Sequence, residues 1–291
     1  MHVEIIAEVG ECFNGNIETA LNMIVEAKKC GCDVVKFQLL DMNEVSPNDP
    51  EYDWFASLNI DIDNLRRLID CANNNDIGIL FTPVSVREAE MMKAVGLKNV
   101  KIASSFVNKT ELITYINDNF DEIYMSTGMA ELVEIDNALK HLYRPEKVKL
   151  LHCISEYPTG PLLEQRGLKA LDEKDVHLNM MNILINRYPN YIVGYSDHTD
   201  DIFVPEVAAA MGAKLIEKHF TLDRATPIYH YEHGLKYMGT DHVLSIEPKQ
   251  MKKMVDNIRR IEIIQGDDKW NRSNGEKILI NFLRGRYIDR N

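Results

Sequence analysis

The chain of 291 residues lacks long apolar runs and a leader-like N-terminus. No stretch approaches the roughly 18–20 consecutive uncharged apolar residues that a membrane helix needs. The first residues enter a strand-like run directly, with no basic segment and apolar stretch before a cleavage site. The sequence therefore predicts a cytoplasmic protein that does not act at a membrane.

The chain contains few cysteines, and it has fewer basic than acidic residues. The five cysteines, at positions 12, 30, 32, 71 and 153, are odd in number and scattered, so we expect no disulfide framework. Lys and Arg total 33 against 45 Asp and Glu, which gives a net charge of −12. This balance argues against nucleic acid as a partner, whereas a local cluster of lysines can still bind a small anion. No P-loop or dinucleotide fingerprint occurs.

Eight short β-rich runs recur along the chain, with helical patterns between them. They are Val3–Val9, Asp33–Leu39, Ile77–Thr82, Asn99–Ser104, Glu122–Ser126, Lys147–Ile154, Tyr191–Ser196 and Lys214–Phe220. Several are nearly continuous apolar runs, which are typical of parallel strands buried on both faces. Eight such strands favour an α/β fold of the closed (β/α)8 TIM-barrel type. Strands and helices also alternate in an open doubly wound sheet, which stays the alternative.

No Pro/Gly/Ser-rich linker, low-complexity run or internal repeat divides the chain. We therefore predict a single domain over residues 1–291, in which residues from about 267 to 291 form a polar, loop-like tail.

Polar residues gather at the carboxyl ends of the predicted strands, where barrels carry their chemistry. Glu8, Lys36 and Lys101 lie in otherwise apolar strands and need partners, because burying an unpaired charge costs several kcal/mol. Four hydroxyl residues follow the strands at the same end: Thr82, Ser104, Ser126 and Ser196. Together they predict a cationic pocket rich in hydrogen-bond donors, suited to a phosphate or a carboxylate. The alternative is that the lysines only pair with acids at the barrel ends.

Two histidines follow consecutive strands at this end. His198 and His219, with a carboxylate from Glu8 or Asp241, could hold a divalent transition metal. The alternative is a pair of hydrogen-bonded imidazoles. Cys153 is interpreted as a buried strand residue, since a reactive thiol needs an oriented base.

At these same residues the sequence resembles the sialic acid synthase family, the NeuB-like synthases. The motifs occur in register from about residue 4 to about residue 250: Ala7-Glu8-Val9-Gly10, Val35-Lys36-Phe37-Gln38, Phe81-Thr82-Pro83, Lys101-Ile102-Ala103-Ser104, Ser126-Thr127-Gly128-Met129, Leu151-His152-Cys153, Tyr157-Pro158-Thr159, Gly194-Tyr195-Ser196-Asp197-His198-Thr199 and Glu217-Lys218-His219-Phe220-Thr221.

The resemblance implies a barrel that condenses phosphoenolpyruvate with an aldose, typically N-acetylmannosamine, to give a nonulosonic acid and phosphate. It implies a divalent metal, usually Mn²⁺, on His198 and His219, and a homodimer. The positions that match the phosphoenolpyruvate site are Lys36, Thr82, Lys101, Ser104, Ser126, Ser155 and Ser196, although Asn is common in place of Ser155. Those near the metal or the sugar are Glu8, Gln38, Tyr157 and Asp241. Glu8, Lys36 and Lys101 are the expected catalytic residues.

The sequence departs from the family where we expect the acceptor sugar. Cys12 and Phe13 replace a common Asn-His, Ser105 and Phe106 replace a Gly and an acidic residue, and Arg224–Thr240 is enlarged. We therefore expect an acceptor different from N-acetylmannosamine, in a pocket shaped by aromatic residues. They are Phe106, Tyr229, Tyr231 and Tyr237.

The family's small C-terminal antifreeze-like domain, which gives an Arg to the partner's sugar site, is not expected here. Groups of the enlarged loop are candidates to replace it: Arg224, His230, His233 and Lys236. We prefer a loop role for both histidines over a second metal site. Two other functions stay open. One is a deoxy-sugar-acid phosphate synthase, and the other is a non-catalytic or regulatory barrel.

Overall fold

The computed structural model describes residues 2–49, 52–156, 171, 173–232, 235–267 and 269–284. An eight-stranded parallel sheet within them has the order β3-β2-β1-β8-β7-β6-β5-β4. The strands are β1 (Glu4–Glu8), β2 (Val34–Leu39), β3 (Gly78–Pro83), β4 (Asn99–Ile102), β5 (Glu122–Ser126), β6 (Val148–Cys153), β7 (Ile192–Asp197) and β8 (Leu215–His219). The first and last residues of each strand lie within two positions of the ends of the run predicted from the sequence.

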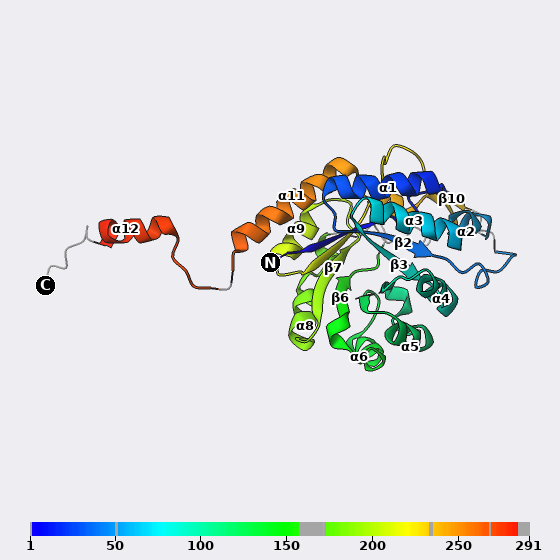
Figure 1. Cartoon of the computed structure of the whole chain (residues 1–291), viewed down its shortest axis with the longest axis horizontal. Helices are drawn as coiled ribbons and strands as arrows, with labels where there is room; N and C mark the ends of the chain where they lie inside the picture. The colour runs from blue at the N-terminus through cyan, green and yellow to red at the C-terminus, as the bar shows by residue number, and fades with distance from the viewer. Residues whose placement is uncertain are drawn as a thin grey trace.

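The sheet curves until its two outer strands, β3 and β4, lie side by side, and the side chain of Asn99 bridges them by donating to the carbonyl of Ile79 at 3.0 Å. Helices cover the outside (Figure 1). They are α1 (Ile17–Cys30), α2 (Tyr52–Leu58), α3 (Ile62–Asn74), α4 (Val86–Ala94), α5 (Thr110–Asn119), α6 (Leu132–His141), α8 (Asn179–Arg187), α9 (Phe203–Ala210), α10 (Thr240–Leu244) and α11 (Pro248–Gln265), with 3₁₀ turns at Ser104–Phe106, Pro145–Lys147 and Glu173–Asp175. The predicted (β/α)8 barrel is confirmed, and the open sheet is excluded.

Alternation along the strands builds the barrel interior in layers. One apolar layer fills the middle and is formed by Ile6, Val34, Leu80, Tyr124, Leu151 and Leu215. Two residues further along the same strands come Glu8, Lys36, Thr82, Ser126, Cys153 and Glu217, all buried. Because strand side chains alternate between the two faces of a sheet, these six must point into the barrel at its carboxyl end. Because side chains alternate along each strand, the layer of polar residues lies directly on the apolar layer in the barrel interior.

On the other side of the apolar layer, a cluster of charged residues closes the amino-terminal end of the barrel. Lys149 Nζ lies 2.8 Å from Glu4 and 2.7 Å from Glu122. It also donates to the hydroxyl of Tyr124 at 2.9 Å. Each of these residues is an inward-facing strand position, so the cluster stabilises the barrel at the end opposite to the site.

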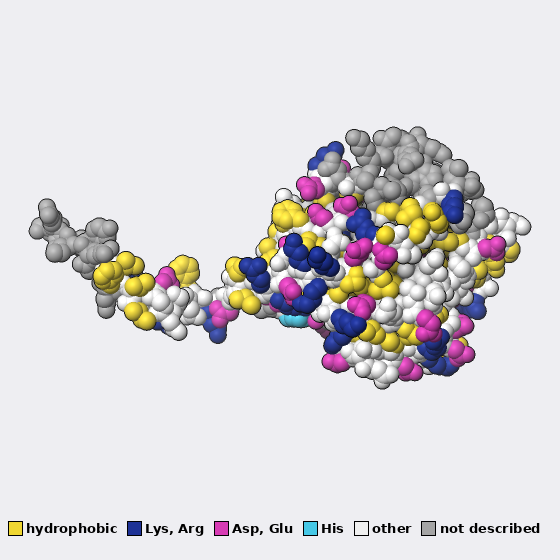
Figure 2. Space-filling view, turned by 90° about the horizontal axis from the view of Figure 1, so that it is seen from above, with side chains coloured by type: hydrophobic (Ala, Val, Ile, Leu, Met, Phe, Trp, Pro, Cys, Tyr) yellow, Lys and Arg dark blue, Asp and Glu magenta, His cyan; other side chains and the backbone are white. Residues whose placement is uncertain are grey.

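Two segments follow the barrel strands. The enlarged segment Arg224–Thr240 contains a hairpin of β9 (Tyr229–Glu232) and β10 (Leu235–Met238), which leads into α10. The tail contains α12 (Asn274–Arg284), so the loop-like prediction for it was wrong over these residues. Figures 1 and 2 show α12 extending away from the barrel, with apolar side chains uncovered along it. No helix within the described ranges combines the length and the apolar character that a membrane crossing requires.

Candidate active site

A cavity of about 280 Å³ opens at the carboxyl ends of the barrel strands. Its walls come from all eight strands or the segments that follow them: Glu8, Lys36, Gln38, Thr82, Val84, Lys101, Ala103, Ser104, Ser105, Phe106, Ser126, Met129, Cys153, Ser155, Ser196, His198, Glu217 and His219. We call it the main cavity. Most of its polar groups are buried in the apo protein, so their charges act on a ligand through a medium of low dielectric constant.

Two lysines share one carboxylate at the base of the main cavity. Lys101 Nζ donates to Glu217 Oε1 at 2.8 Å and Oε2 at 2.6 Å, and Lys36 Nζ lies 2.9 Å from Oε1. Burial opposes ionisation of Glu217, but the two ammonium groups outweigh it and hold the pKa of this carboxyl far below its usual range. Burial, with the charge of Lys36, lowers the pKa of Lys101 to about 8, although Glu217 opposes the change.

Glu8 completes this cluster from β1. Its Oε2 lies 3.2 Å from Lys36 Nζ, and its Oε1 accepts a hydrogen bond from Gln38 at 3.2 Å. Burial raises the pKa of Glu8 to about 7, against the opposing charge of Lys36. A carboxyl group poised near neutrality can both take up and release a proton at physiological pH.

The hydroxyl groups of the main cavity fall into two kinds. Thr82 Oγ1 and Ser126 Oγ are buried, and neither has a hydrogen-bond partner in the described part of the chain. Ser196 donates to Glu217 at 2.9 Å, and Ser104 accepts the backbone N–H of Gly128 at 3.1 Å. Buried polar groups are rarely left without partners. The two unpartnered hydroxyls are therefore free to donate to a ligand with acceptor oxygens.

The two histidines lie against each other at the rim of the same cavity. Their ring centroids are 5.2 Å apart at an interplanar angle of 74°. His219 Nδ1 lies 3.8 Å from Asp241 Oδ1, too far for a hydrogen bond, and His198 Nε2 lies 3.9 Å from Cys153 Sγ. Burial and the neighbouring His198 lower the pKa of His219 well below its usual value. His219 is therefore neutral, which is the form that can bind a metal.

The donor set fits a divalent transition metal by type, because it offers two imidazoles beside a carboxylate. Among the described residues, no set of three or more His, Cys, Asp and Glu side chains is gathered closely enough to hold a metal ion by itself. His219 Nδ1 has no hydrogen-bond partner within the same residues. An ion here would thus rest on two imidazoles and take its other ligands from water, Asp241 or a substrate.

A fully buried ion pair stands behind the histidines. Lys218 Nζ lies 2.7 Å from Asp197 Oδ2 and also donates to the carbonyl of Thr199. Asp197 accepts further hydrogen bonds from the hydroxyls of Tyr195 at 2.8 Å and Thr199 at 2.7 Å. Because Asp197 and Lys218 each precede a histidine in sequence, this network fixes the ends of β7 and β8 from the outer face of the sheet.

Most of the site residues predicted from the sequence meet in the main cavity. They are Glu8, Lys36, Gln38, Thr82, Lys101, Ser104, Ser126, Ser155, Ser196, His198 and His219. Asp241 lines a smaller neighbouring cavity instead, and Tyr157 lies outside the described residues. Their roles in binding and catalysis stay predictions.

The residues that depart from the family pattern do not all lie in one cavity. Phe106 and Ser105 line the main cavity, and Phe13 lines the smaller one. Cys12 lines neither and contacts Ser245 at 3.3 Å. His233 lies outside the described residues, as do the side chains of His230, Tyr231 and Tyr237.

Glu217 is the residue that sequence reasoning missed. The run Glu217-Lys218-His219 offers three polar side chains, and only His219 was assigned a role. The alternation that turns His219 inward also turns Glu217 inward and Lys218 outward. A strict period-two reading of this strand would have found it.

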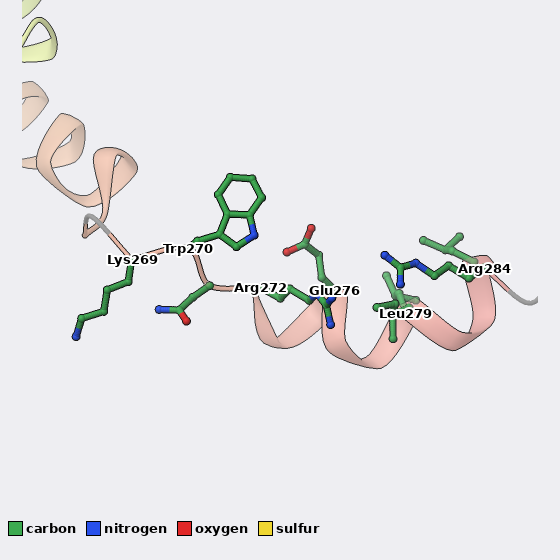
Figure 3. A pocket seen from close by; sticks show the side chains of 9 residues that line it. Lys269, Trp270, Arg272, Glu276, Leu279 and Arg284 are labelled. Carbon is green, nitrogen blue, oxygen red and sulfur yellow. The ribbon is translucent and has the colours of Figure 1, made fainter.

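A larger cavity, of about 590 Å³, lies along the tail. Figure 3 shows that the side chains lining it come from Lys269 to Arg284, so it contains no residue of the barrel. It contains none of the residues predicted to carry chemistry, so the main cavity is the candidate active site.

The fold and the sequence of the chain match a family of barrel synthases. A model described as the NeuB family matches residues 23–269. N,N'-diacetyllegionaminic acid synthase of Campylobacter jejuni is 31% identical over 96% of this chain and 82% of its own length. N-acetylneuraminate-9-phosphate synthase of Drosophila melanogaster is 29% identical over 90% and 68%, respectively.

A solved structure is also similar over the whole chain. The N-acetylneuraminic acid synthetase of Leptospira borgpetersenii, in complex with citrate, superposes with a TM-score of 0.85 at 29% identity and covers 100% of this chain and 94% of that one. The chain belongs to the NeuB family, as its motifs predicted.

Proposed function

We propose that the protein condenses phosphoenolpyruvate with an open-chain aldose to give a 3-deoxy sugar acid of the nonulosonic type and inorganic phosphate. The observation that carries this proposal is the lysine pair with two unpartnered buried hydroxyls, Thr82 and Ser126, beside a pair of imidazoles. The relatives named above are synthases of sialic-type acids, which supports the same reaction class: a carbon–carbon bond-forming transferase.

The phosphate and carboxylate of phosphoenolpyruvate suit the base of the main cavity. Lys36 and Lys101 carry two positive charges when both are protonated, and the carboxylate of Glu217 between them neutralises one. Lys101 Nζ lies 2.6 Å from Glu217 Oε2. Thr82 and Ser126 supply uncharged donors that the apo protein leaves unused. Charge-assisted hydrogen bonds to an anion in such a site are about twice as strong as neutral ones.

A divalent metal, with Mn²⁺ as the first candidate, would be held by His198 and His219. Bound there, it would act as a Lewis acid toward the acceptor aldehyde. Neutral His219 provides a lone pair, and Asp241, 3.8 Å away, can hold the other polar groups of the acceptor.

The reaction forms one carbon–carbon bond and a carbon–oxygen bond from water, and it breaks the bond between C2 and the phosphate oxygen. Of the two protons of the water, one ends on the former aldehyde oxygen and the other leaves with the phosphate. The enol carbon of phosphoenolpyruvate attacks the aldehyde carbon, and water adds to C2, where positive charge develops. The phosphate then leaves with its bridging oxygen, and the keto group forms. Lys36 and Lys101 stabilise the departing phosphate. Glu8 is the proposed acceptor of a proton from the attacking water, and its pKa near 7 supports this role.

Phosphate release from phosphoenolpyruvate with a panel of aldoses, with and without Mn²⁺, tests the proposal. We expect release that needs both the metal and one class of free aldose, together with a 3-deoxy-2-keto acid product. Turnover only with phosphorylated aldoses would establish the deoxy-sugar-acid phosphate synthase instead. No release with any aldose would leave the non-catalytic barrel. Near-normal turnover in Glu8→Gln, when His198→Ala is inactive, would remove the base assignment from Glu8.

A further inference from the structure

The C-terminal part of the chain differs in charge from the rest. Residues 248–284 contain nine Lys and Arg against five Asp and Glu, although the whole chain has a net charge of −12. Figure 2 shows Lys and Arg side chains gathered on the part of the barrel from which the tail departs. A basic segment at one end of an acidic protein is typical of a contact with an anionic surface.

The helix α12 has an apolar face and a basic face. The apolar face consists of four residues at helical spacing: Ile278, Leu279, Phe282 and Leu283. They fall within an arc of about 140° when each residue turns the helix by about 100°, and each side chain is at least 46% exposed. Lys277 and Arg284 lie opposite to the centre of this arc. The helix is therefore amphipathic, and its charged face is mainly cationic.

The segment before α12 adds an aromatic ring and further cations. The side chain of Trp270 is fully exposed. The cavity of about 590 Å³ along the tail, shown in Figure 3, is lined by apolar Leu279 and Leu283 and by basic Arg272 and Arg284. Apolar walls beside guanidinium groups suit the upper part of an acyl chain and the phosphate of a phospholipid headgroup.

Three kinds of surface can be compared as partners for α12. An isolated helix of 11 residues is only marginally stable in water, so it gains from a surface that covers its apolar face. Nucleic acid matches the basic charge but offers nothing to that apolar face. A second copy of this acidic chain would also need an apolar groove of matching length. A bilayer with anionic lipids supplies both charge and apolar depth along the whole helix.

We propose that residues 269–284 form an interfacial anchor that binds the surface of a bilayer containing anionic lipids. The helix α12 lies in the plane of the membrane, with its apolar face toward the acyl chains and with Lys277 and Arg284 at the headgroups. Trp270 lies at the headgroup level, which this side chain favours.

This anchor is of another kind than the contact that the sequence argued against. The expectation of no action at a membrane came from the lack of a spanning segment, and a helix that lies on the surface needs none. The anchor is also separate from the reaction in the main cavity, because no residue of the tail lines that cavity.

Flotation of the full chain with lipid vesicles tests the anchor. One set of vesicles contains equal parts of phosphatidylglycerol and phosphatidylcholine, and the other contains phosphatidylcholine alone. We expect at least about tenfold stronger binding to the anionic vesicles, since each Lys or Arg near an anionic surface contributes about fivefold. Added salt should weaken this binding. Equal binding to both kinds of vesicle, or binding to neither, would overturn the proposal.

Fluorescence locates the contact. The chain has two tryptophans, of which Trp54 belongs to the barrel and Trp270 to the tail. Transfer of Trp270 into the interface should shift its emission to shorter wavelength when anionic vesicles are added, and Trp270→Phe should remove the shift. A shift that persists in Trp270→Phe would contradict the position assigned to the tail.

Variants separate the two faces of α12. Ile278→Asp with Leu279→Asp should weaken vesicle binding at least about tenfold, because two charges then enter the apolar boundary. Replacing Arg272, Lys277 and Arg284 by Gln should remove the preference for anionic vesicles. Ile183→Asp on α8, at a side chain that is also about half exposed, is the matched control and should bind as the wild type does.

The same variants detect the other partner. Light scattering without lipid measures whether the full chain self-associates. Self-association that Ile278→Asp with Leu279→Asp abolishes, in a chain that binds no vesicles, would show that α12 packs on a second copy and would overturn the membrane anchor. Equal losses of vesicle binding in Ile183→Asp and in the α12 variant would also overturn it.

Discussion

Lys101 donates two hydrogen bonds to the carboxylate of Glu217, and at most 5% of either side chain is exposed. The two residues belong to β4 and β8, on opposite sides of the barrel. Glu217 therefore serves as an internal counter-ion for a site whose proposed ligand is itself an anion. This carboxylate favours the charged form of both lysines and offsets part of the cost of their desolvation.

Replacing Glu217 tests this compensation. Glu217→Gln leaves two buried ammonium groups without their shared anion, and removing one partner of a buried ion pair costs about 3–5 kcal/mol. Inorganic phosphate should restore part of that loss by binding between Lys36 and Lys101. Urea unfolding with and without phosphate measures both effects, and phosphate should stabilise the variant more than the wild type.

Glu122→Gln is the matched control for this experiment. It removes an acid 2.7 Å from partly buried Lys149 at the other end of the barrel, outside the main cavity. Its unfolding free energy should show no added response to phosphate. A phosphate response equal to that of the wild type in Glu217→Gln would contradict the counter-ion role.

Glu11 makes stability depend on pH. Its pKa rises from the ordinary value of 4.5 to about 8 in the folded chain, because burial and Asp241 disfavour its charge. Between these values the folded chain keeps a proton that the unfolded chain has released, so the free energy of unfolding falls as the pH rises from 4.5 to 8. The wild type should thus lose stability relative to Glu11→Gln across this window.

Urea unfolding at half-unit steps of pH measures the difference. The advantage of Glu11→Gln should be smallest below pH 4.5 and reach a plateau above pH 8. Glu111→Gln on α5 provides the reference curve. Parallel stability curves for the wild type and Glu11→Gln would show that Glu11 ionises as freely in the folded chain as in the unfolded one.

The sequence predicted the barrel because each strand is a nearly continuous apolar run, and it predicted most of the main cavity because barrel chemistry follows strand ends. The tail was misjudged. Its polar residues near Asp267 suggested a loop, but Ile278, Leu279, Phe282 and Leu283 lie at helical spacing in α12. The apolar spacing is a helix signal, whereas the polar composition of the flanking residues favours a loop.

The smaller cavity beside the main one could not be predicted in the same way. It forms where Glu11 in an irregular loop meets Leu58 of α2 and Asp241 of α10, three segments far apart in sequence. No local period or motif encodes such a meeting, because it depends on how the segments pack after the barrel has closed. Glu217 was missed for a different reason, because strand alternation alone is enough to turn its side chain into the barrel.

The ion pair of Lys218 and Asp197, on the outer face of the sheet next to the histidines, should show energetic coupling. Lys218→Met leaves the carboxylate of Asp197 buried without its cation and should cost about 3–5 kcal/mol. The double variant Lys218→Met/Asp197→Leu removes both charges and should lose less than the sum of the single changes. Urea unfolding of the four proteins gives the coupling energy, and additive losses would contradict a paired role.

Gly128 controls the hydroxyl wall of the main cavity. A Cβ at this position would overlap Ser155 Oγ and would lie 2.8 Å from Ser104 Oγ, so one added methyl group must push both hydroxyls aside. If these hydroxyls bind phosphoenolpyruvate, Gly128→Ala should raise its KM about tenfold, the equivalent of one or two displaced hydrogen bonds. The KM of the aldose should change less, because the acceptor is proposed to bind at the histidines and not at these two hydroxyl groups. Adding Ser155→Ala should recover part of the loss by making room for the methyl group, whereas equal changes in both KM values would indicate a general distortion of the barrel mouth.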